Sequence, residues 1–303
     1  MKNPKKRKLD KERLSFTLMA LPFVAFTFIF SYVPLFGWMF AFTNYKPGRS
    51  LRSLKFEGLK YFRYLITFWK DVSNALVNTL ALSALSLITM VLPIIFALLL
   101  NEVRSSRYKR VVQTVVTLPN FVSWIIVYSL CFALFSTDGM VNMLFQTLGI
   151  DYTVNILGNA NASWVFMTVL GVWKSLGWNS IVYLAAIAGV DETLYDAAKV
   201  DGAGRFRCAV HVTLPGILPT FLVLLILGIG NLLNLGMEKY LLFSNTVTSS
   251  KLEVIDLLTY RMGIGTQQYS FATAVGILKS GVSILLLTIA NLLAKKIRGE
   301  TVL

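Results

Sequence analysis

Six long apolar stretches dominate this chain of 303 residues and constrain the solvent in which it can fold. Backbone groups in hydrocarbon must bond to one another, so about 18 or more apolar residues in a row indicate a helix that crosses a core of ~30 Å. We therefore expect an all-α integral membrane protein, a bundle of about six transmembrane helices. The predicted spans are Phe16–Phe42, Ala75–Leu100, Val111–Phe135, Ala162–Ile187, Leu218–Leu235 and Phe271–Ala294.

The basic residues indicate how these spans are oriented. Lys and Arg resist translocation, so loops rich in them stay on the cytoplasmic side. Seven precede the first span and none lies in the loop 138–161, which should therefore be external. We expect both termini in the cytoplasm: a basic arm over residues 1–15, a transmembrane domain over 16–294 and a tail over 295–303. The first span is too long and too rich in Phe for a cleaved signal peptide.

The loop after the first span does not follow this rule. It should be external, yet it carries seven basic residues. They could attract an acidic solute such as a uronic-acid oligosaccharide, or dock an acidic binding protein or anionic lipid. The net charge of +14 would suggest nucleic-acid binding in a soluble protein. In this chain the basic residues lie mostly in the loops between membrane spans, so we expect no nucleic-acid partner. The seven are Lys46, Arg49, Arg52, Lys55, Lys60, Arg63 and Lys70.

A polar segment at about 190–215, between the fourth and fifth spans, is typical of two short helices. Asp191 can cap the first at its N-terminus, and Gly202 can end it because glycine enters the left-handed region at little cost. The second would run from about Gly204 until Pro215 opens the next span. Leu194, Ala197, Ala198 and Asp201 share one narrow face of the first helix. Such a face suits docking to another protein, although a connector packed on its own bundle is the alternative.

The spacing within this segment resembles the EAA signature of importer-type ABC permeases. An acidic residue precedes two alanines, a glycine follows six positions after the acid, and Leu-Pro comes near position nineteen; Asp196 replaces the usual Glu. The resemblance extends to the oligosaccharide branch of these permeases, through Tyr32-Val33-Pro34 and Gly58-Leu59-Lys60-Tyr61-Phe62 among others. It implies a type I importer permease fold and a coupling loop for an ATPase. The coupling residues would be Leu194, Asp196, Ala197, Ala198, Asp201, Gly202, Ala203, Phe206 and Pro215.

The resemblance also implies the partners. These are a second homologous permease subunit, two copies of a cytoplasmic ABC ATPase, and an extracellular or periplasmic solute-binding protein, assembled in a bacterial inner membrane. The chain itself contains no Gly-x-x-x-x-Gly-Lys-Ser/Thr phosphate loop. We therefore expect no cofactor and no enzymatic activity in this chain, with ATP and Mg bound by the partner ATPase. His211 is the sole histidine and has no Cys or His at metal-ligand spacing, so no metal site is expected.

Polar side chains inside the predicted spans are candidates for the solute path, because they are costly in hydrocarbon and face a partner or water. Amide and aromatic groups together suit sugars. Asn and Ser could instead join helices, and Trp and Tyr could belong to the interfacial belt. The candidates are Lys174, Trp178, Asn179 and Tyr183 in the fourth span, and Asn231, Asn234 and Glu238, aligned at i, i+3 and i+7, at the fifth.

Two other classes of protein remain possible at this level. An ion-coupled secondary transporter would show repeated halves and membrane carboxylates, and no convincing repeat is found. A membrane enzyme acting on lipid-linked sugar would need a cluster of His, Asp or Glu at the membrane face. The interpretation favoured by the sequence is the permease subunit of an ATP-driven, binding-protein-dependent importer, for oligosaccharides.

Overall fold

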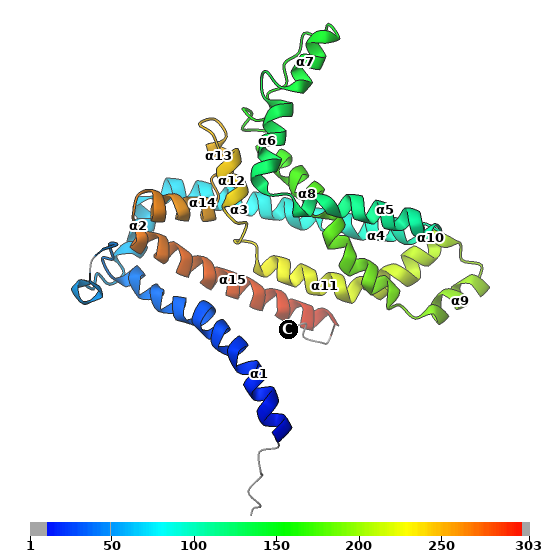
Figure 1. Ribbon diagram of the computed structural model, residues 1–303, viewed down its shortest axis with the longest axis horizontal. Helices are drawn as coiled ribbons and strands as arrows, with labels where there is room; N and C mark the ends of the chain where they lie inside the picture. The colour runs from blue at the N-terminus through cyan, green and yellow to red at the C-terminus, as the bar shows by residue number, and fades with distance from the viewer. Residues whose placement is uncertain (1–10, 49, 299–303) are drawn as a thin grey trace, which may run out of the picture. The chain divides into compact units, whose positions relative to one another are not determined.

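The computed structural model describes residues 11–48 and 50–298, and in them the chain is helical, with one isolated β-bridge between Thr43 and Phe56. Arg49, most of the basic arm and the end of the tail lie outside the described residues. Figure 1 traces the helices in chain order. The α-helices are α1 Lys11–Thr27, α2 Lys60–Thr67, α3 Trp69–Thr89, α4 Val91–Asn101, α5 Ser106–Thr117, α6 Trp124–Phe135, α7 Met140–Thr147, α8 Ser163–Ala188, α9 Glu192–Val200, α10 Arg205–Cys208, α11 Leu214–Gly230, α12 Glu238–Phe243, α13 Ser249–Leu252, α14 Ile255–Tyr260 and α15 Tyr269–Arg298.

Shorter helical turns of other kinds connect some of these helices. Three are π-helical: η1 Phe28–Tyr32, η5 Ala209–Thr213 and η6 Arg261–Gly265. Three are 3₁₀: η2 Val33–Phe42, η3 Leu51–Ser53 and η4 Leu118–Phe121. The chain divides into two compact units, one of residues 1–67 and 262–277, the other of 68–261 and 278–303.

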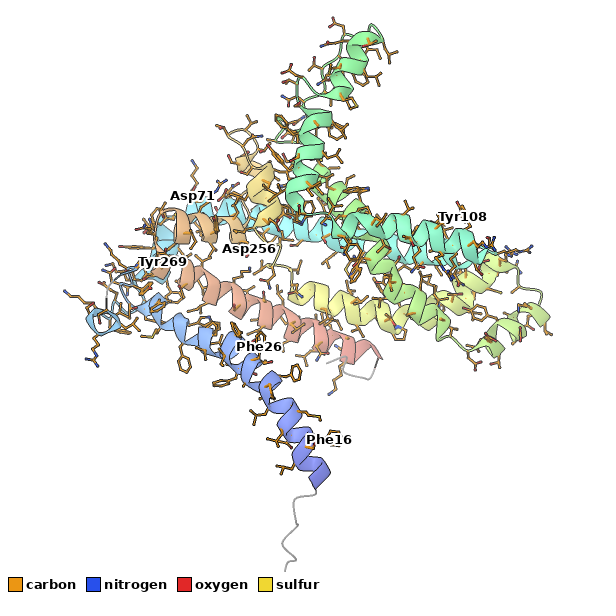
Figure 2. The ribbon with its side chains drawn as sticks, in the orientation of Figure 1. Phe16, Phe26, Asp71, Tyr108, Asp256 and Tyr269 are labelled. Carbon is orange, nitrogen blue, oxygen red and sulfur yellow. The ribbon has the colours of Figure 1, made fainter. Side chains whose placement is uncertain are left out.

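The first unit contains a continuous helical rod, Leu14–Phe42, which is apolar and has no buried residue in its most apolar window. The side chains along α1, such as Phe16 and Phe26, point away from the rod (Figure 2). At its end, Ser270 at the start of α15 donates to the Thr43 carbonyl at 2.6 Å and accepts from the Tyr45 amide at 3.1 Å. An exposed apolar rod of this length needs lipid or a partner helix to cover it.

The second unit is built around α8, which packs against α3, α4, α5 and α11. Gly177 allows the closest approach, because a Cβ on it would lie 2.5 Å from the backbone of Val116 in α5. One core cluster contains Val127, Met167 and Tyr240, and another contains Tyr183, Ile187 and Ile217. Small residues at helix crossings are typical of membrane bundles, where backbones approach closely.

The predicted spans are confirmed in part. Within residues 11–48 and 50–298, five helices are long and apolar enough to cross a membrane: Leu14–Phe42, Trp69–Asn101, Trp124–Thr147, Arg205–Gly230 and Tyr269–Lys296. The fourth predicted span coincides with α8, whose 26 residues also have the length to cross. These helices make the expected all-α bundle.

Two predicted spans are wrong in detail. Val111–Phe135 is not one helix, because α5 ends at Thr117 and η4 and an extended residue, Val122, separate it from α6. A proline cannot donate to the helix ladder, and Pro119 stands at this break. Leu218–Leu235 is also wrong, since α11 ends at Gly230.

Candidate functional site

The α9 segment has the caps that its sequence predicts. The Thr193 amide donates to the Asp191 carboxylate at 2.9 Å, and this backbone bond is the main cause that holds the pKa of Asp191 below its usual value. At the other end Gly202 has φ +77°, in the left-handed region. The Gly202 amide donates to Lys199 O and the Ala203 amide to Ala198 O, at 3.0 and 2.9 Å. These bonds give α9 defined ends although it lies on the surface.

Large apolar side chains on this segment are left without cover in the chain. Leu194 is 53%, Val200 87% and Phe206 82% exposed. Asp196, at the acidic position of the signature, forms an exposed ion pair of 2.9 Å with Lys199 on the same helix. Several large exposed apolar side chains on so short a segment are typical of a surface that binds another protein.

The segment is joined firmly to α11. Helix runs without interruption from Arg205 to Gly230, through the π-turn η5. Pro215 stands in the first turn of α11, where its missing N–H is tolerated, and so opens that helix as predicted. The second short helix does not end before it, however, because the π-turn η5 joins α10 directly to α11. Tyr195 of α9 hydrogen-bonds the buried Thr213 hydroxyl at 2.9 Å. A displacement of α9 thus has a rigid connection to a membrane helix.

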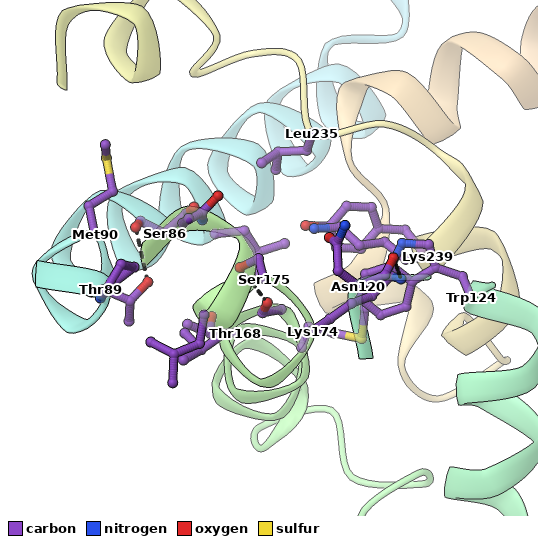
Figure 3. A pocket seen from close by; sticks show the side chains of 18 residues that line it. Ser86, Thr89, Met90, Asn120, Trp124, Thr168, Lys174, Ser175, Leu235 and Lys239 are labelled. Carbon is purple, nitrogen blue, oxygen red and sulfur yellow. Dashed lines mark hydrogen bonds between the residues drawn. The ribbon is translucent and has the colours of Figure 1, made fainter. Parts of the chain in front are cut away.

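The second unit also contains a cavity of about 330 Å³. Figure 3 shows Asn120, Trp124 and Lys239 together on one side of it, and Ser86, Thr89 and Met90 on the other. Its walls come from α3, α4, η4, α6, α8, α12 and the linker before α12. The lining residues are Leu82, Ser86, Thr89, Met90, Pro93, Asn120, Trp124, Met167, Thr168, Gly171, Val172, Lys174, Ser175, Leu176, Asn179, Leu235, Lys239 and Tyr240.

Lys174 lines this cavity, but its ammonium also holds the break after α5. Lys174 Nζ donates to the carbonyls of Pro119 at 3.2 Å, Asn120 at 2.8 Å and Val122. An ammonium group has three donors, so these three carbonyls use all of them. The backbone groups that lose their helical partners at the break are satisfied in this way.

Lys239 differs from Lys174. No hydrogen bond or ion pair joins its ammonium to any residue of the described chain; it lies 5.7 Å from the centroid of the Trp124 ring and 4.8 Å from that of Tyr240. Its helix, α12, is outside the candidate membrane spans. Burial lowers the pKa of Lys239 to about 8. Lys174 lies 5.6 Å from the same Trp124 ring, so two cations share one aromatic side chain.

The remaining predicted path residues divide into three groups. Asn179 lines the cavity. Trp178 is half exposed and meets Phe121 edge-on, and Tyr183 is buried against Ile187 and Ile217. The predicted alignment of Asn231, Asn234 and Glu238 on one helix is wrong, because α11 ends at Gly230 and α12 begins only at Glu238.

Lining residues that sequence reasoning missed include Trp124, Asn120 and Lys239. Lys239 follows the predicted fifth span, so the expected topology with both termini in the cytoplasm places it in an external loop. The one signal in the sequence is a basic residue between a glutamate and a tyrosine. Such a signal is too common to identify a site.

The chain is similar to known membrane transport proteins. The family described as "binding-protein-dependent transport system inner membrane component" matches residues 89–299. The chain is 42% identical over 285 residues to the polygalacturonan/rhamnogalacturonan transport system permease protein YteP of Bacillus subtilis strain 168, and the match covers 93% of this chain and 88% of that one.

Two solved structures are similar over nearly the whole chain. One is a bacterial ABC transporter involved in the import of the acidic polysaccharide alginate, with TM-score 0.85, 35% identity, and coverage of 95% of this chain and 97% of that chain. The other is a bacterial alginate ABC transporter in complex with an alginate pentasaccharide-bound periplasmic protein, with TM-score 0.86, 34% identity, and coverage of 96% and 97%.

Proposed function

Because this chain belongs to the family of binding-protein-dependent transport system inner membrane components, we propose that it is the permease subunit through which an ATP-driven importer moves oligosaccharides. ATP is hydrolysed on a separate subunit that docks on α9 and the turn after it. The observation that carries the proposal is the uncovered apolar patch of Leu194, Val200 and Phe206 on a segment continuous with a membrane helix.

The patch has the properties that coupling needs. Its ends are defined by the Asp191 cap and the Gly202 turn, so a partner would bind a preformed helix at little entropic cost. Ala197 and Ala198 share the face of α9 that contains Leu194, and their small side chains leave room for close approach. Movement of the patch would reach α11 through the helix Arg205–Gly230 and through the bond from Tyr195 to Thr213.

The cavity in the second unit is proposed as part of the solute path. Its volume is within the range of small-molecule sites, and it combines aromatic rings with hydroxyl and amide groups. Sugars stack their C–H faces on such rings while their hydroxyls need donors and acceptors. Oligosaccharide cargo also agrees with the relatives, one described as a polygalacturonan/rhamnogalacturonan permease and another as involved in alginate import.

The proposed assembly contains a second, homologous permease, two copies of the ATPase and an external solute-binding protein, with both termini of this chain in the cytoplasm. The solved relative in complex with a periplasmic protein supports the binding protein. Lys46, Arg52, Lys55 and Arg63 are exposed on the first loop and would face that protein or the solute, while Lys60 pairs with Glu57 at 2.9 Å. ATP-driven closure of the ATPase pair would move α9 and alternate the bundle between inward-open and outward-open states.

Truncation of Phe206 tests the docking role. Phe206 makes few contacts in its own chain, so Phe206→Ala should leave insertion intact. It should weaken ATPase association by about 30-fold if Phe206 is a central contact worth about 2 kcal/mol. Tyr152→Ala removes another exposed ring, on the loop before α8, and is the matched control.

Co-purification of the ATPase and ATP-dependent uptake by proteoliposomes are the measurements. Ala198→Trp should act in the same direction as Phe206→Ala, by filling the small face. Association equal to wild type in both variants would refute the docking role. Uptake that persists without ATP would favour an ion-coupled transporter instead.

A further inference from the structure

We propose that the cavity beside α12 selects solutes that carry carboxylates, and that Lys239 is the residue that binds them, which makes acidic oligosaccharides the cargo. This inference rests on the proposed importer function and specifies its substrate class. It starts from a charge imbalance: the lining contains two lysines and no Asp or Glu.

The first step concerns the state of Lys239 without solute. Among the described residues its ammonium has two aromatic rings as neighbours and no hydrogen-bond acceptor. Three N–H donors therefore remain available at the cavity. A half-buried cation without a counterion is unfavourable, and an anion that reaches it gains a charge-assisted hydrogen bond where water is limited.

The second step concerns Lys174. Its donors are taken by three backbone carbonyls, so it is a positioning residue that holds η4 and the start of α6, including Trp124, in place. Its charge nevertheless remains near the same ring as Lys239. The Lys174 ammonium also interacts electrostatically with the carboxylate of Glu238. Lys239 is therefore the cation beside Trp124 that is left to bind a carboxylate of the solute.

The third step concerns the rest of the cavity, which suits the neutral part of a sugar. Thr89, Thr168 and Ser175 donate their hydroxyl protons to helix carbonyls, at 2.8 to 3.0 Å. Their oxygens are therefore left as acceptors for sugar hydroxyls. Trp124, which is half-buried, lines the cavity beside the cation. The cavity thus combines a cationic end with a hydroxyl-accepting end, as a uronic-acid unit requires.

A carboxylate is favoured over other anions by two relatives. One is described as a permease for polygalacturonan and rhamnogalacturonan, and the other belongs to a system that imports an acidic polysaccharide. The exposed basic residues of the first loop would act in the same direction at longer range.

The test uses the complete importer in proteoliposomes, with saturating binding protein and ATP. The probes are trimers of galacturonate and of mannuronate, together with the same trimers after reduction of their carboxyls to alcohols. The quantity compared is the ratio of initial uptake rates, acidic to reduced. The variants are Lys239→Met and Lys239→Arg. Lys251→Met is the matched control, because Lys251 lies outside the cavity but its Nζ is also close to a tryptophan, 4.4 Å from the centroid of the Trp164 ring.

We expect wild type to prefer an acidic trimer. Lys239→Met should lower the ratio of uptake rates about tenfold or more, as expected for the loss of a charged hydrogen bond. Lys239→Arg should retain most of the wild-type ratio, and Lys251→Met should have the same ratio as wild type. A ratio unchanged in Lys239→Met, or wild-type uptake of reduced trimers alone, overturns the inference while the importer function stands. If no trimer enters with ATP, the inference is overturned as well, and the proposed function fails with it only if the ATPase also does not co-purify with the chain.

Discussion

Gly177 on α8 offers a direct test of how the bundle is packed. An alanine there would place its Cβ 2.5 Å from the carbonyl carbon and oxygen of Val116, and 2.6 Å from the amide of Thr117. Ordinary contacts begin at 3.4 Å, so α8 and α5 would have to separate by about 0.9 Å. Backbone atoms, unlike the end of a flexible side chain, cannot turn aside.

The expected cost follows from two opposing terms. Overpacking costs typically about 1–3 kcal/mol, and replacing a mid-helix glycine by alanine contributes about 0.5–1 kcal/mol of stability. Gly177→Ala should therefore be destabilised by about 1–2 kcal/mol. Separation of the helices would also stretch the bonds from Lys174, one turn away, to the carbonyls around η4.

Gly171→Ala is the control on the same helix, since its Cβ would meet nothing within 4 Å. It should be neutral or slightly more stable. Thermal unfolding of the purified protein in detergent measures the difference, which should be roughly 2–4 °C per kcal/mol. The packing argument is wrong if Gly177→Ala unfolds at the same temperature as Gly171→Ala or at a higher one.

Two further predictions concern ionised groups. Asp256 and Lys279 form an ion pair whose side chains are 17% and 16% exposed, and Asp256 also accepts a hydrogen bond of 2.8 Å from the Gly236 amide. Asp256→Ala should lower the free energy of unfolding by about 3–5 kcal/mol, because it leaves Lys279 uncompensated. A thermal midpoint within 2–4 °C of wild type, which corresponds to roughly 1 kcal/mol, would contradict this. The Thr193 amide lowers the pKa of Asp191 in the folded state. The Asp191 carboxylate therefore stabilises α9 fully above the pKa of the unfolded state, about 3.9, and this stabilisation is lost as the pH falls through the lower pKa of the folded state. Hydrogen exchange of the α9 amides, corrected for intrinsic rates, should show this loss in wild type and not in Asp191→Asn, whose neutral amide still caps; equal pH dependence in both would contradict it.

Local features of the sequence predicted the local structure well. The Asp191 cap and the Gly202 turn are confirmed, because both depend on residues within a few positions of one another. The all-α membrane bundle followed from the length of the apolar stretches, and the family from the spacing between Asp196 and Pro215. The roles assigned to the coupling residues remain predictions.

Hydropathy could not predict the break between α5 and α6. The stretch Val111–Phe135 is apolar on average, and its mean hydropathy is the same whether it forms one helix or two. The break is stable because Lys174, more than 50 residues further along, supplies donors to the freed carbonyls. No window of the sequence contains both partners.

The sequence by itself thus determined the solvent, the helical class, the family and the caps of α9, since each is written in neighbouring residues or in a fixed spacing. The tertiary structure alone decided where the third and fifth predicted spans end, and it brought Lys239 of α12 and Lys174 of α8 to the same tryptophan of α6. Contacts between residues far apart in the chain depend on how helices pack, and the cationic cavity is such a contact.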